Sequence, residues 1–351
     1  MEQGQRVNSN KLTEYIVASQ VFKDNPFSII DVGCSGGISK MWSVFEPCLK
    51  AYGIDPVISE CERLNNQTNN KNIKYFPGLI GLNESHHDYD KVKEASSQIR
   101  NPFNDLSAKL ASDILNDKVQ SSEKLSLLNN WTDQDLVKEE DKISLKQFIN
   151  TNRITNLDFI KIDIDGDDFE ALLSLEQAPR DLSVCGFALE VNFYGGTNLY
   201  EHTFHNTDLY MRKLGYQLFD LSIRKYSLSS LPLPFEYDMP AQTIMGRPYQ
   251  GDAIYLLDPL LIKEKAMHGI NISQSPLKLL KLICIFECLG LYDHAARLIL
   301  EFDEELQNTI NTKEMLDILV KQINPKCTNY REYITNFKNN PKSLFRSIWD
   351  Q

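Results

Sequence analysis

The stretch FSIIDVGCSGG, at residues 27–37, constrains the fold of this chain more than any other part of its sequence. The run Phe27–Val32 predicts a buried strand, and three glycines in the next five positions predict a sharp turn after it. Similar apolar runs recur along the chain and alternate with helical patterns, which is typical of a parallel sheet covered on both faces. We therefore expect an α/β fold with a doubly wound, mostly parallel sheet of seven strands. The other six strands are predicted at residues 49–54, 73–76, 157–162, 184–191, 216–221 and 253–257.

Two gaps between these strands are too long for simple crossovers. Residues 82–150 are polar and predict an insertion after the third strand, whereas residues 222–250, rich in proline and aromatic residues, predict a substrate loop. Beyond residue 259 the apolar residues follow helical spacing, and Gly290 is expected to end the first helix of a hairpin. The predicted domains are a helical segment at 1–26, a sheet domain at 27–258 and a helical domain at 259–351.

The helix predicted at residues 277–289 carries apolar residues on every face, which indicates more burial than one neighbouring helix provides. We therefore expect a homodimer through the C-terminal helices or a tight contact between domains. Cys284 and Cys288 lie four positions apart on this helix, as a metal-binding pair could. Because no ligand set completes them, we expect both to be buried packing residues.

The charge balance of the chain argues against one class of partner. Its 351 residues carry a net charge of −11, whereas proteins that bind nucleic acid usually present a basic face. The seven cysteines are scattered without a CxxC pair, which favours a reducing compartment. The sequence shows no apolar signal core and no run of about 18 apolar residues. We expect a cytoplasmic protein that neither spans a membrane nor binds nucleic acid.

The glycine turn discriminates among cofactors. The phosphate-loop pattern GxxxxGK[ST] is absent, and the dinucleotide pattern GxGxxG fails at its second glycine, where Ser35 would obstruct a pyrophosphate. What remains is D-x-G-x-x-x-G, formed by Asp31, Gly33 and Gly37. Such a turn suits a cofactor without phosphates, such as S-adenosylmethionine. A plain turn between a strand and a helix is the alternative.

Asp55 ends the second predicted strand. An acid at this place can accept hydrogen bonds from the ribose hydroxyls of an adenosine cofactor. Because Pro56 follows, a turn aspartate is the simpler alternative. The combination with the glycine turn favours ribose binding.

The fourth predicted strand runs into an acidic cluster, in the sequence LDFIKIDIDGDDFEALLSL. Asp163 and Asp165 point to the same side of an extended chain, and Asp167 and Asp168 open the following helix. Helix capping accounts for one or two of these acids. Carboxylates this close are costly unless a cation or hydrogen-bond donors hold them, so the cluster indicates a binding site.

These motifs resemble those of the FkbM family of S-adenosylmethionine-dependent methyltransferases, which act on hydroxyl groups of sugars and natural products. The family's D-x-G-x-N-x-G matches Asp31, Gly33 and Gly37, with Ser35 in place of the asparagine, and its Glu-Pro matches Asp55-Pro56. Its K-x-D-x-E-G-x-E matches Lys161, Asp163, Asp165, Gly166 and Asp168, with aspartate twice in place of glutamate.

The resemblance extends over about residues 25–258 and implies a class I methyltransferase fold that binds S-adenosylmethionine. The adenine would lie against the residues after the third strand, and a serine-containing stretch of the insertion would lie near the cofactor. The cofactor residues implied are Asp31, Gly33, Ser35 and Gly37 at the methionine end, Asp55 at the ribose, Leu79 and Ile80 at the adenine, and Ser107 and Asp163.

An alcohol acceptor must lose a proton during methyl transfer, which calls for a general base or a metal ion. Asp163 is the carboxylate expected to meet the acceptor or the methionine amino group, and His202 and His205, after the fifth strand, are candidate bases. His86 and His87 are further histidines, in the insertion.

A magnesium ion is the other candidate, because related sugar O-methyltransferases place carboxylates around Mg²⁺. Its ligands here would be Asp163, Asp165 and Glu190. Pairing of Glu190 with Lys161 or Arg212 is the alternative. The aromatic residues between 226 and 249 suit a wall for a sugar ring, although packing over the sheet would explain them equally.

The resemblance thus implies O-methylation of a sugar, glycan or natural-product hydroxyl. Two alternatives remain open at this point. One is an NAD(P)-dependent sugar oxidoreductase or epimerase on a similar fold, which Ser35 disfavours. The other is a methyltransferase-like binding module without catalytic activity. The aspartates that stand where the family has glutamates favour this alternative.

Overall fold

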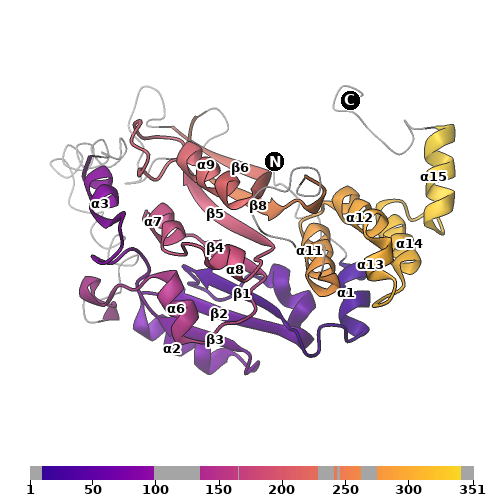
Figure 1. Ribbon diagram of the computed structural model, residues 1–351, viewed down its shortest axis with the longest axis horizontal. Helices are drawn as coiled ribbons and strands as arrows, with labels where there is room; N and C mark the ends of the chain where they lie inside the picture. Colours follow the sequence, from indigo (N-terminus) through magenta and orange to yellow (C-terminus); the bar gives the residue numbers. More distant parts are fainter. Residues whose placement is uncertain are drawn as a thin grey trace, which may run out of the picture. The chain divides into compact units, whose positions relative to one another are not determined.

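The computed structural model describes residues 10–98, 135–164, 166–227, 241–242, 246–261 and 275–340 (Figure 1). The chain divides into two compact units. One consists of Met1–Ser28, Ser39–Lys50 and Pro259–Gln351, and the other of Ile29–Ile38 and Ala51–Asp258. The N-terminal segment predicted at 1–26 therefore shares a unit with the C-terminal helices. None of the helices within the described ranges is long and apolar enough to cross a membrane.

One sheet, in the strand order β3-β2-β1-β4-β5-β8-β6-β7, dominates the second unit (Figure 1). β1 pairs with β4, β2 with β3, and β4 with β5 in parallel, whereas β8 is antiparallel to β5 and β6. The strands are β1 (Phe27–Val32), β2 (Leu49–Asp55), β3 (Ile73–Pro77), β4 (Phe159–Ile162), β5 (Gly186–Asn192), β6 (Tyr216–Ser227), β7 (Ala241–Gln242) and β8 (Arg247–Leu257).

This topology confirms the predicted class I methyltransferase fold. All six residues of β1 are buried, as expected for an inner strand with both faces covered. The sheet has one strand more than predicted, the two-residue β7, which pairs with the end of β6. β6 is also longer than expected, because it continues past residue 221 to Ser227 alongside β8.

Helices connect the strands of this unit. The described part of the predicted insertion contains α3, η3 and α6, and residues 99–134 lie outside the description. The Thr203 side chain caps α9, and Gly215 ends this helix with a φ of +102°. The helices are α2 (Ile58–Gln67), α3 (Tyr89–Gln98), η3 (Glu139–Asp141), α6 (Leu145–Thr151), α7 (Asp168–Leu173), α8 (Ala178–Asp181) and α9 (Phe204–Leu214).

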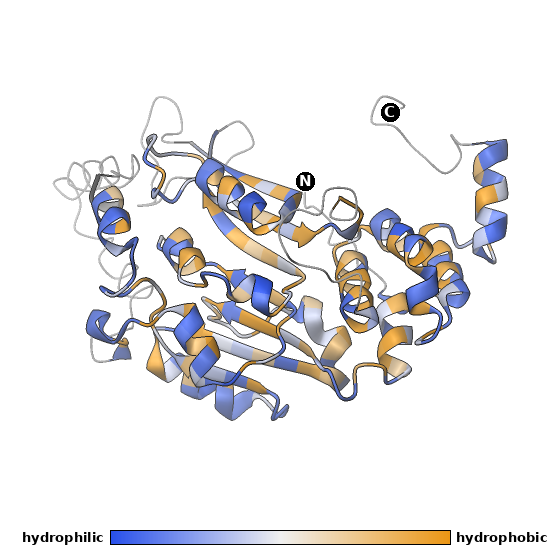
Figure 2. Cartoon of the chain, viewed as in Figure 1, coloured by the Kyte–Doolittle hydropathy of each residue, from blue (hydrophilic) through white to orange (hydrophobic). Residues whose placement is uncertain are grey.

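The first unit is helical. Its predicted hairpin is present as α11 and α12, with Gly290 at a φ of +77° between them. α11 is largely apolar and buried, which explains its apolar residues on every face (Figure 2). Its helices are α1 (Lys11–Ala18), η1 (Lys40–Cys48), α11 (Pro276–Cys288), α12 (Tyr292–Glu301), α13 (Asp303–Leu306), α14 (Thr312–Ile323) and α15 (Tyr330–Asn339).

Two charged side chains of α11 are fully buried. The Glu287 carboxylate accepts hydrogen bonds from the amides of Leu12 and Thr13, at 2.8 and 2.6 Å, and from Gln322. Lys281 donates to the carbonyl of Pro26 at 2.8 Å. These contacts tie the N-terminal segment to α11 within one unit.

All seven cysteines are free, and Cys284 and Cys288 are buried in α11 as packing residues.

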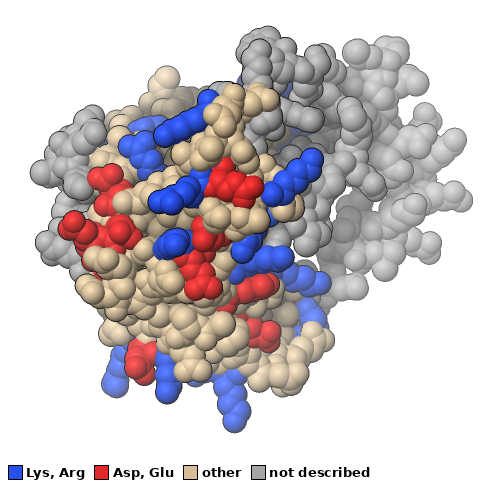
Figure 3. Space-filling model, turned by 90° about the vertical axis from the view of Figure 1, so that its right-hand side faces the viewer, with Lys and Arg blue, Asp and Glu red and all other residues tan. Residues whose placement is uncertain are grey.

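On the face shown in Figure 3, acidic and basic side chains are interspersed. That face presents no large patch of one sign.

Candidate functional site

The glycine turn after β1 is shaped by its contact with the end of β4. Gly33, Gly36 and Gly37 adopt φ angles of +80°, +82° and +97°, which favour glycine. At Gly33 the constraint is also steric, because a Cβ atom would lie 1.8 Å from the carbonyl oxygen of Asp163. The Gly33 amide donates to the carbonyl of Ile54, at the end of β2, at 2.9 Å. The turn is therefore fixed between β2 and β4.

The second half of the turn is held from α2 and β3. The Gly36 amide donates to the carboxylate of Glu60 at 2.9 Å. A Cβ atom at Gly37 would lie 3.3 Å from the hydroxyl of Tyr75, which itself accepts a hydrogen bond from the amide of Ile38. Gly37 therefore packs against Tyr75 within the turn.

A cavity of about 320 Å³ lies where β1, β2, β3 and β4 end. This is the carboxyl edge of the parallel strands, where ligands bind in open α/β folds. Asp31 and Gly37 do not line the cavity, and Ser107 lies outside the described residues. Six of the predicted cofactor residues do line it, namely Gly33, Ser35, Asp55, Leu79, Ile80 and Asp163.

Asp55 presents a buried carboxyl group to this cavity. The amide of Val57 donates to its Oδ1 at 2.9 Å, and the amide of Ser35 also donates to it. Burial nevertheless raises the pKa of Asp55 above its usual value, with a further contribution from Glu60. A ligand that donates hydrogen bonds to this carboxyl would favour its ionised form.

Asp31 belongs to β1, directly before the glycine turn, and does not line the cavity. The Lys161 ammonium group lies 3.3 Å from Asp31, 3.2 Å from Asp163 and 3.4 Å from the carbonyl oxygen of Gly33. Burial raises the pKa of Asp31 to about 6, against the opposing effect of Lys161. Lys161 therefore joins the ends of β1 and β4 below the site.

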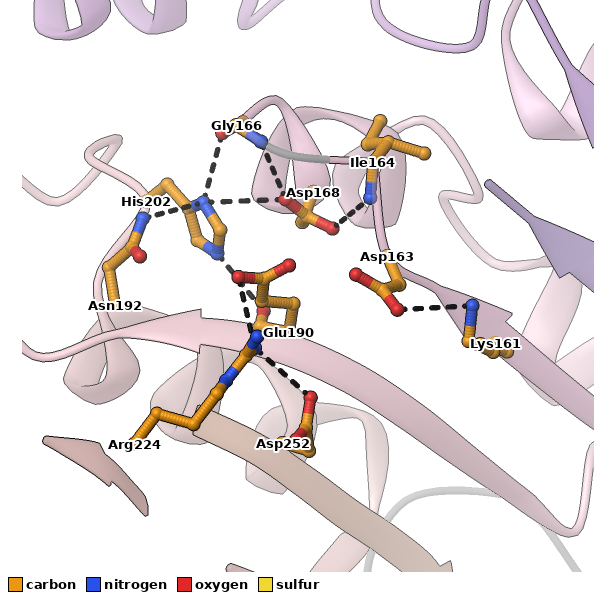
Figure 4. Close-up of polar contacts among 10 residues, drawn as sticks. All are labelled: Lys161, Asp163, Ile164, Gly166, Asp168, Glu190, Asn192, His202, Arg224 and Asp252. Atoms are coloured by element: carbon orange, nitrogen blue, oxygen red, sulfur yellow. Dashed lines mark hydrogen bonds and ion pairs between the residues drawn. The ribbon is translucent and has the colours of Figure 1, made fainter. Parts of the chain in front are cut away.

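Asp163 also faces the end of β5. Its carboxyl group and that of Glu190 share a hydrogen bond and point toward each other in Figure 4. Burial and this hydrogen bond raise the pKa of Glu190 to about 8. Burial opposes ionisation of Asp163 as well, but the hydrogen bond and Lys161 outweigh it and lower the pKa of Asp163. Asp163 is therefore the ionised member of the pair.

Arg224, from β6, places a positive charge beside the carboxyl groups of Glu190 and Asp252. Its guanidinium lies 3.1 Å from Glu190 and 3.3 Å from Asp252 of β8 (Figure 4). The structure therefore gives Glu190 a partner other than Lys161 or Arg212. Arg212 instead pairs with Asp208 within α9, at 2.7 Å.

Two of the three predicted magnesium ligands, Asp163 and Glu190, are not free to bind a hard divalent cation. Such an ion needs several free oxygen ligands, whereas Asp163 and Glu190 are held by a shared hydrogen bond and by Lys161 and Arg224. Within the described ranges, neither carboxylate belongs to a group of three close metal-ligating side chains. Asp165, the third predicted ligand, lies outside the described residues.

Asp168 and His202 hold the loop after β4 in place (Figure 4). The Asp168 carboxylate accepts from the amides of Ile164 and Gly166, at 2.9 and 3.1 Å, and lies 3.7 Å from His202 Nδ1. His202 Nδ1 lies 2.9 Å from the Gly166 carbonyl oxygen, and Nε2 lies 3.1 Å from that of Glu190. Nδ1 also lies 3.1 Å from the side-chain nitrogen of Asn192, so both ring nitrogens are engaged within the fold, which favours a positioning role over proton abstraction.

His205 lies apart from this cluster. It is exposed at the start of α9, where its Nδ1 lies 3.0 Å from the hydroxyl oxygen of Thr203, and it does not line the cavity.

Part of the predicted aromatic wall is described. The Tyr249 ring stacks on Tyr194 with centroids 4.5 Å apart and meets Tyr226 edge-on at 5.4 Å. The rest of that wall, at residues 228–240 and 243–245, lies outside the described residues.

Comparison with known proteins agrees with this architecture. The model of the methyltransferase FkbM domain family matches residues 40–218, about half of the chain. No curated protein matches the sequence.

Among solved structures, the chain is similar to the magnesium protoporphyrin IX methyltransferase from Synechocystis with bound SAM. The two chains are 10% identical, with a TM-score of 0.29, over 72% of this chain and 81% of that one. It is also similar to a TehB-like SAM-dependent methyltransferase from Corynebacterium glutamicum, at 11% identity and a TM-score of 0.27, over 70% of this chain and 88% of that one. The fold assignment rests on strand order and on the family match.

Proposed function

Because the chain belongs to the FkbM methyltransferase domain family, we propose that its cavity binds S-adenosylmethionine and that it methylates a hydroxyl group. The observation that carries this proposal is the joint lining of one cavity by Gly33, Asp55 and Asp163. These residues come from the ends of β1, β2 and β4, which are far apart in the sequence. Each has a separate role toward such a cofactor.

Asp55 is suited to the ribose. Its carboxyl group lies at the end of β2 and lines the cavity together with the adjoining Leu79 and Ile80, which suit the flat face of an adenine. Gly33 lines the cavity without a side chain and is suited to the methionine end of the ligand. Ser35 lines the cavity at the position where a dinucleotide-binding turn carries its second glycine, which supports a cofactor without a diphosphate.

Asp163 is suited to the acceptor. When bound, S-adenosylmethionine supplies an electrophilic methyl group attached to its sulfonium. Asp163 lines the cavity as a carboxylate, so it can accept a hydrogen bond from an acceptor hydroxyl and orient it, whereas its lowered pKa makes it a weak base. Glu190 and Lys161 hold the carboxylate of Asp163 from two sides, and His202 fixes the backbone carbonyl of Glu190.

The charges around Asp163 favour an acceptor without phosphate groups. Lys161 and Arg224, the two cations of this cluster, each pair with two carboxylates. The stacked tyrosines after β5 and in β8 would suit the apolar face of a neutral sugar ring. A carbohydrate hydroxyl is therefore the acceptor that we propose.

The test has two stages. Calorimetric titration with S-adenosylhomocysteine establishes whether the cavity binds the cofactor product. Methyl transfer from S-adenosylmethionine to neutral sugars and to the corresponding sugar phosphates, with and without Mg²⁺, then identifies the acceptor. We expect transfer to a neutral sugar that does not require Mg²⁺. Binding of NADH in place of S-adenosylhomocysteine would overturn the proposal.

A further inference from the structure

A second group of possible ligands lies in the loop between β3 and α3, outside the cofactor cavity. His86, His87 and Asp88 are consecutive, and one ligand atom from each lies within 4.8 Å of the other two. The two imidazole rings stack with centroids 4.4 Å apart, and His87 Nε2 lies 3.0 Å from Asp88 Oδ2. Within the ranges that the structure describes, this is the one group of three such side chains.

His86 has an unsatisfied polar atom at this place. Its Nε2 is buried and has no hydrogen-bond partner among the described residues. A buried nitrogen without a partner carries a desolvation cost that a bound ligand would remove.

Asp88 is held in place by two further side chains. Its Oδ1 accepts from the hydroxyl of Tyr200 at 3.0 Å and from the ammonium of Lys91 at 2.9 Å. Oδ2 therefore belongs to an oriented carboxylate and faces His87. Contacts of this kind orient metal ligands.

We propose that His86, His87 and Asp88 form a binding site for a divalent transition metal ion such as Zn²⁺. Two imidazoles and one carboxylate suit Zn²⁺, Co²⁺ or Ni²⁺, whereas Mg²⁺ and Ca²⁺ prefer oxygen ligands alone. Three protein ligands leave the remaining coordination positions to water. The site is independent of methyl transfer and does not rest on the proposed function.

One hydrogen bond opposes this binding. His86 Nδ1 accepts from the Asp88 amide at 3.2 Å, so the proton of the neutral ring lies on Nε2. A metal bound at Nε2 displaces that proton to Nδ1 and breaks the hydrogen bond. We therefore expect weaker binding than at a structural zinc site with four protein ligands.

Metal binding at this site would connect two segments of the same unit. Ile80, six residues before His86, lines the cofactor cavity. Asp88 contacts Tyr200, which lies between β5 and α9, shortly before His202. A metal held by Asp88 would therefore fasten the loop after β3 to the segment after β5.

The experiment is a calorimetric titration of the full chain, free of any purification tag, with ZnCl₂, followed by Co²⁺ absorption spectroscopy. We expect one metal ion per chain and an affinity lowered by His86→Ala or His87→Ala more than the roughly 10- to 100-fold that the loss of an outer-shell partner costs. His87 is exposed, so that variant tests binding even where His86→Ala disturbs the fold. Tyr200→Phe should weaken binding to a smaller extent, because it removes one hydrogen bond to Asp88.

His294→Ala is the matched control. His294 lies 3.1 Å from Asp293 in a similar exposed pair but has no second imidazole in a ligand group with it. Unchanged zinc binding in this variant supports the proposal. Absence of Zn²⁺ and Co²⁺ binding by the wild type would overturn it, as would binding that both His86→Ala and His87→Ala leave unchanged.

Discussion

The backbone of Gly33 lies directly against that of Asp163, so that a Cβ atom on Gly33 would sit 1.8 Å from the Asp163 carbonyl oxygen. This contact brings the turn after β1 to the end of β4, and both residues line the cofactor cavity. The sheet places the two strands side by side, with Val32 opposite Ile162. The geometry of the site therefore depends on a residue without a side chain at position 33.

Gly33→Ala and Gly36→Ala should differ sharply. Both residues have a φ near +80°, so an alanine at either position incurs strain of about 1–2 kcal/mol. Only at Gly33 does the new methyl group also meet the backbone of Asp163, whereas the space at Gly36 is open. We expect Gly33→Ala to weaken S-adenosylhomocysteine binding at least about tenfold more than Gly36→Ala, by calorimetry. Equal losses would contradict the steric role of this contact.

Lys161→Met should destabilise the sheet unit by leaving the buried carboxylate of Asp31 without its cation. Removing one member of a fully buried pair costs ~3–5 kcal/mol, and the partial exposure of Lys161 reduces the expected loss to about 2 kcal/mol. Chemical denaturation of Lys161→Met, Asp31→Asn and the double variant measures the coupling. We expect the double variant to be more stable than the sum of the single losses predicts, and strict additivity would refute the pairing.

Asp31 should make stability depend on pH. Its pKa is raised from 3.8 to about 6, so the folded state holds the Asp31 proton more tightly than the unfolded state does. The resulting stabilisation is present below about pH 4 and is lost as the pH rises through about 6. Subtracting the pH profile of Asp31→Asn from that of the wild type isolates this contribution. A difference that stays flat between pH 4 and 7 would show that Asp31 is not perturbed.

Glu287→Ala should destabilise the helical unit strongly. Glu287 is fully buried and accepts hydrogen bonds from the amides of Leu12 and Thr13 and from Gln322. Its removal leaves these donors unpaired, for which we expect a loss of about 3 kcal/mol or more in chemical denaturation. Glu305→Ala, at an exposed position, is the control and should change stability by less than about 0.5 kcal/mol. Similar stability of the two variants would be inconsistent with the network around Glu287.

The positions of the strands along the chain and the main ligand edge could be predicted from the sequence because both follow from local patterns. The first strand, predicted at Phe27–Val32, forms there as β1, and Asp163 and Asp167, after the fourth strand, line the cavity. Gly290 similarly ends α11 where the helical spacing stops. In each case apolar periodicity and a glycine decide the structure locally.

The partners of the acids could not be predicted in the same way. The sequence suggests Lys161 or Arg212 as the partner of Glu190, whereas in the structure Arg224 of β6 reaches it across β8, which lies between β5 and β6 in the sheet. That order is a long-range property, which residue spacing does not encode. The contacts of His202 with the Gly166 and Glu190 carbonyl groups likewise depend on where two loops meet.

The division into units also depends on contacts far apart in the sequence. Glu287 and Lys281 would each be read as a charged position on an apolar helix, and nothing nearby indicates their partners. Those partners, Thr13 and Pro26, lie more than 250 positions away in the chain. Grouping of the N-terminal segment with the C-terminal helices therefore became visible only in the structure.

The most direct test of the central claim is calorimetric titration of S-adenosylhomocysteine into the wild type, Asp55→Ala and Asp24→Ala. Asp24 is exposed and lies in the other unit, so its variant controls for the loss of one carboxylate. We predict that the wild type and Asp24→Ala bind alike and that Asp55→Ala loses about 1–3 kcal/mol of binding free energy. Failure of the wild type to bind, or equal binding by Asp55→Ala, would contradict the placement of the cofactor in this cavity.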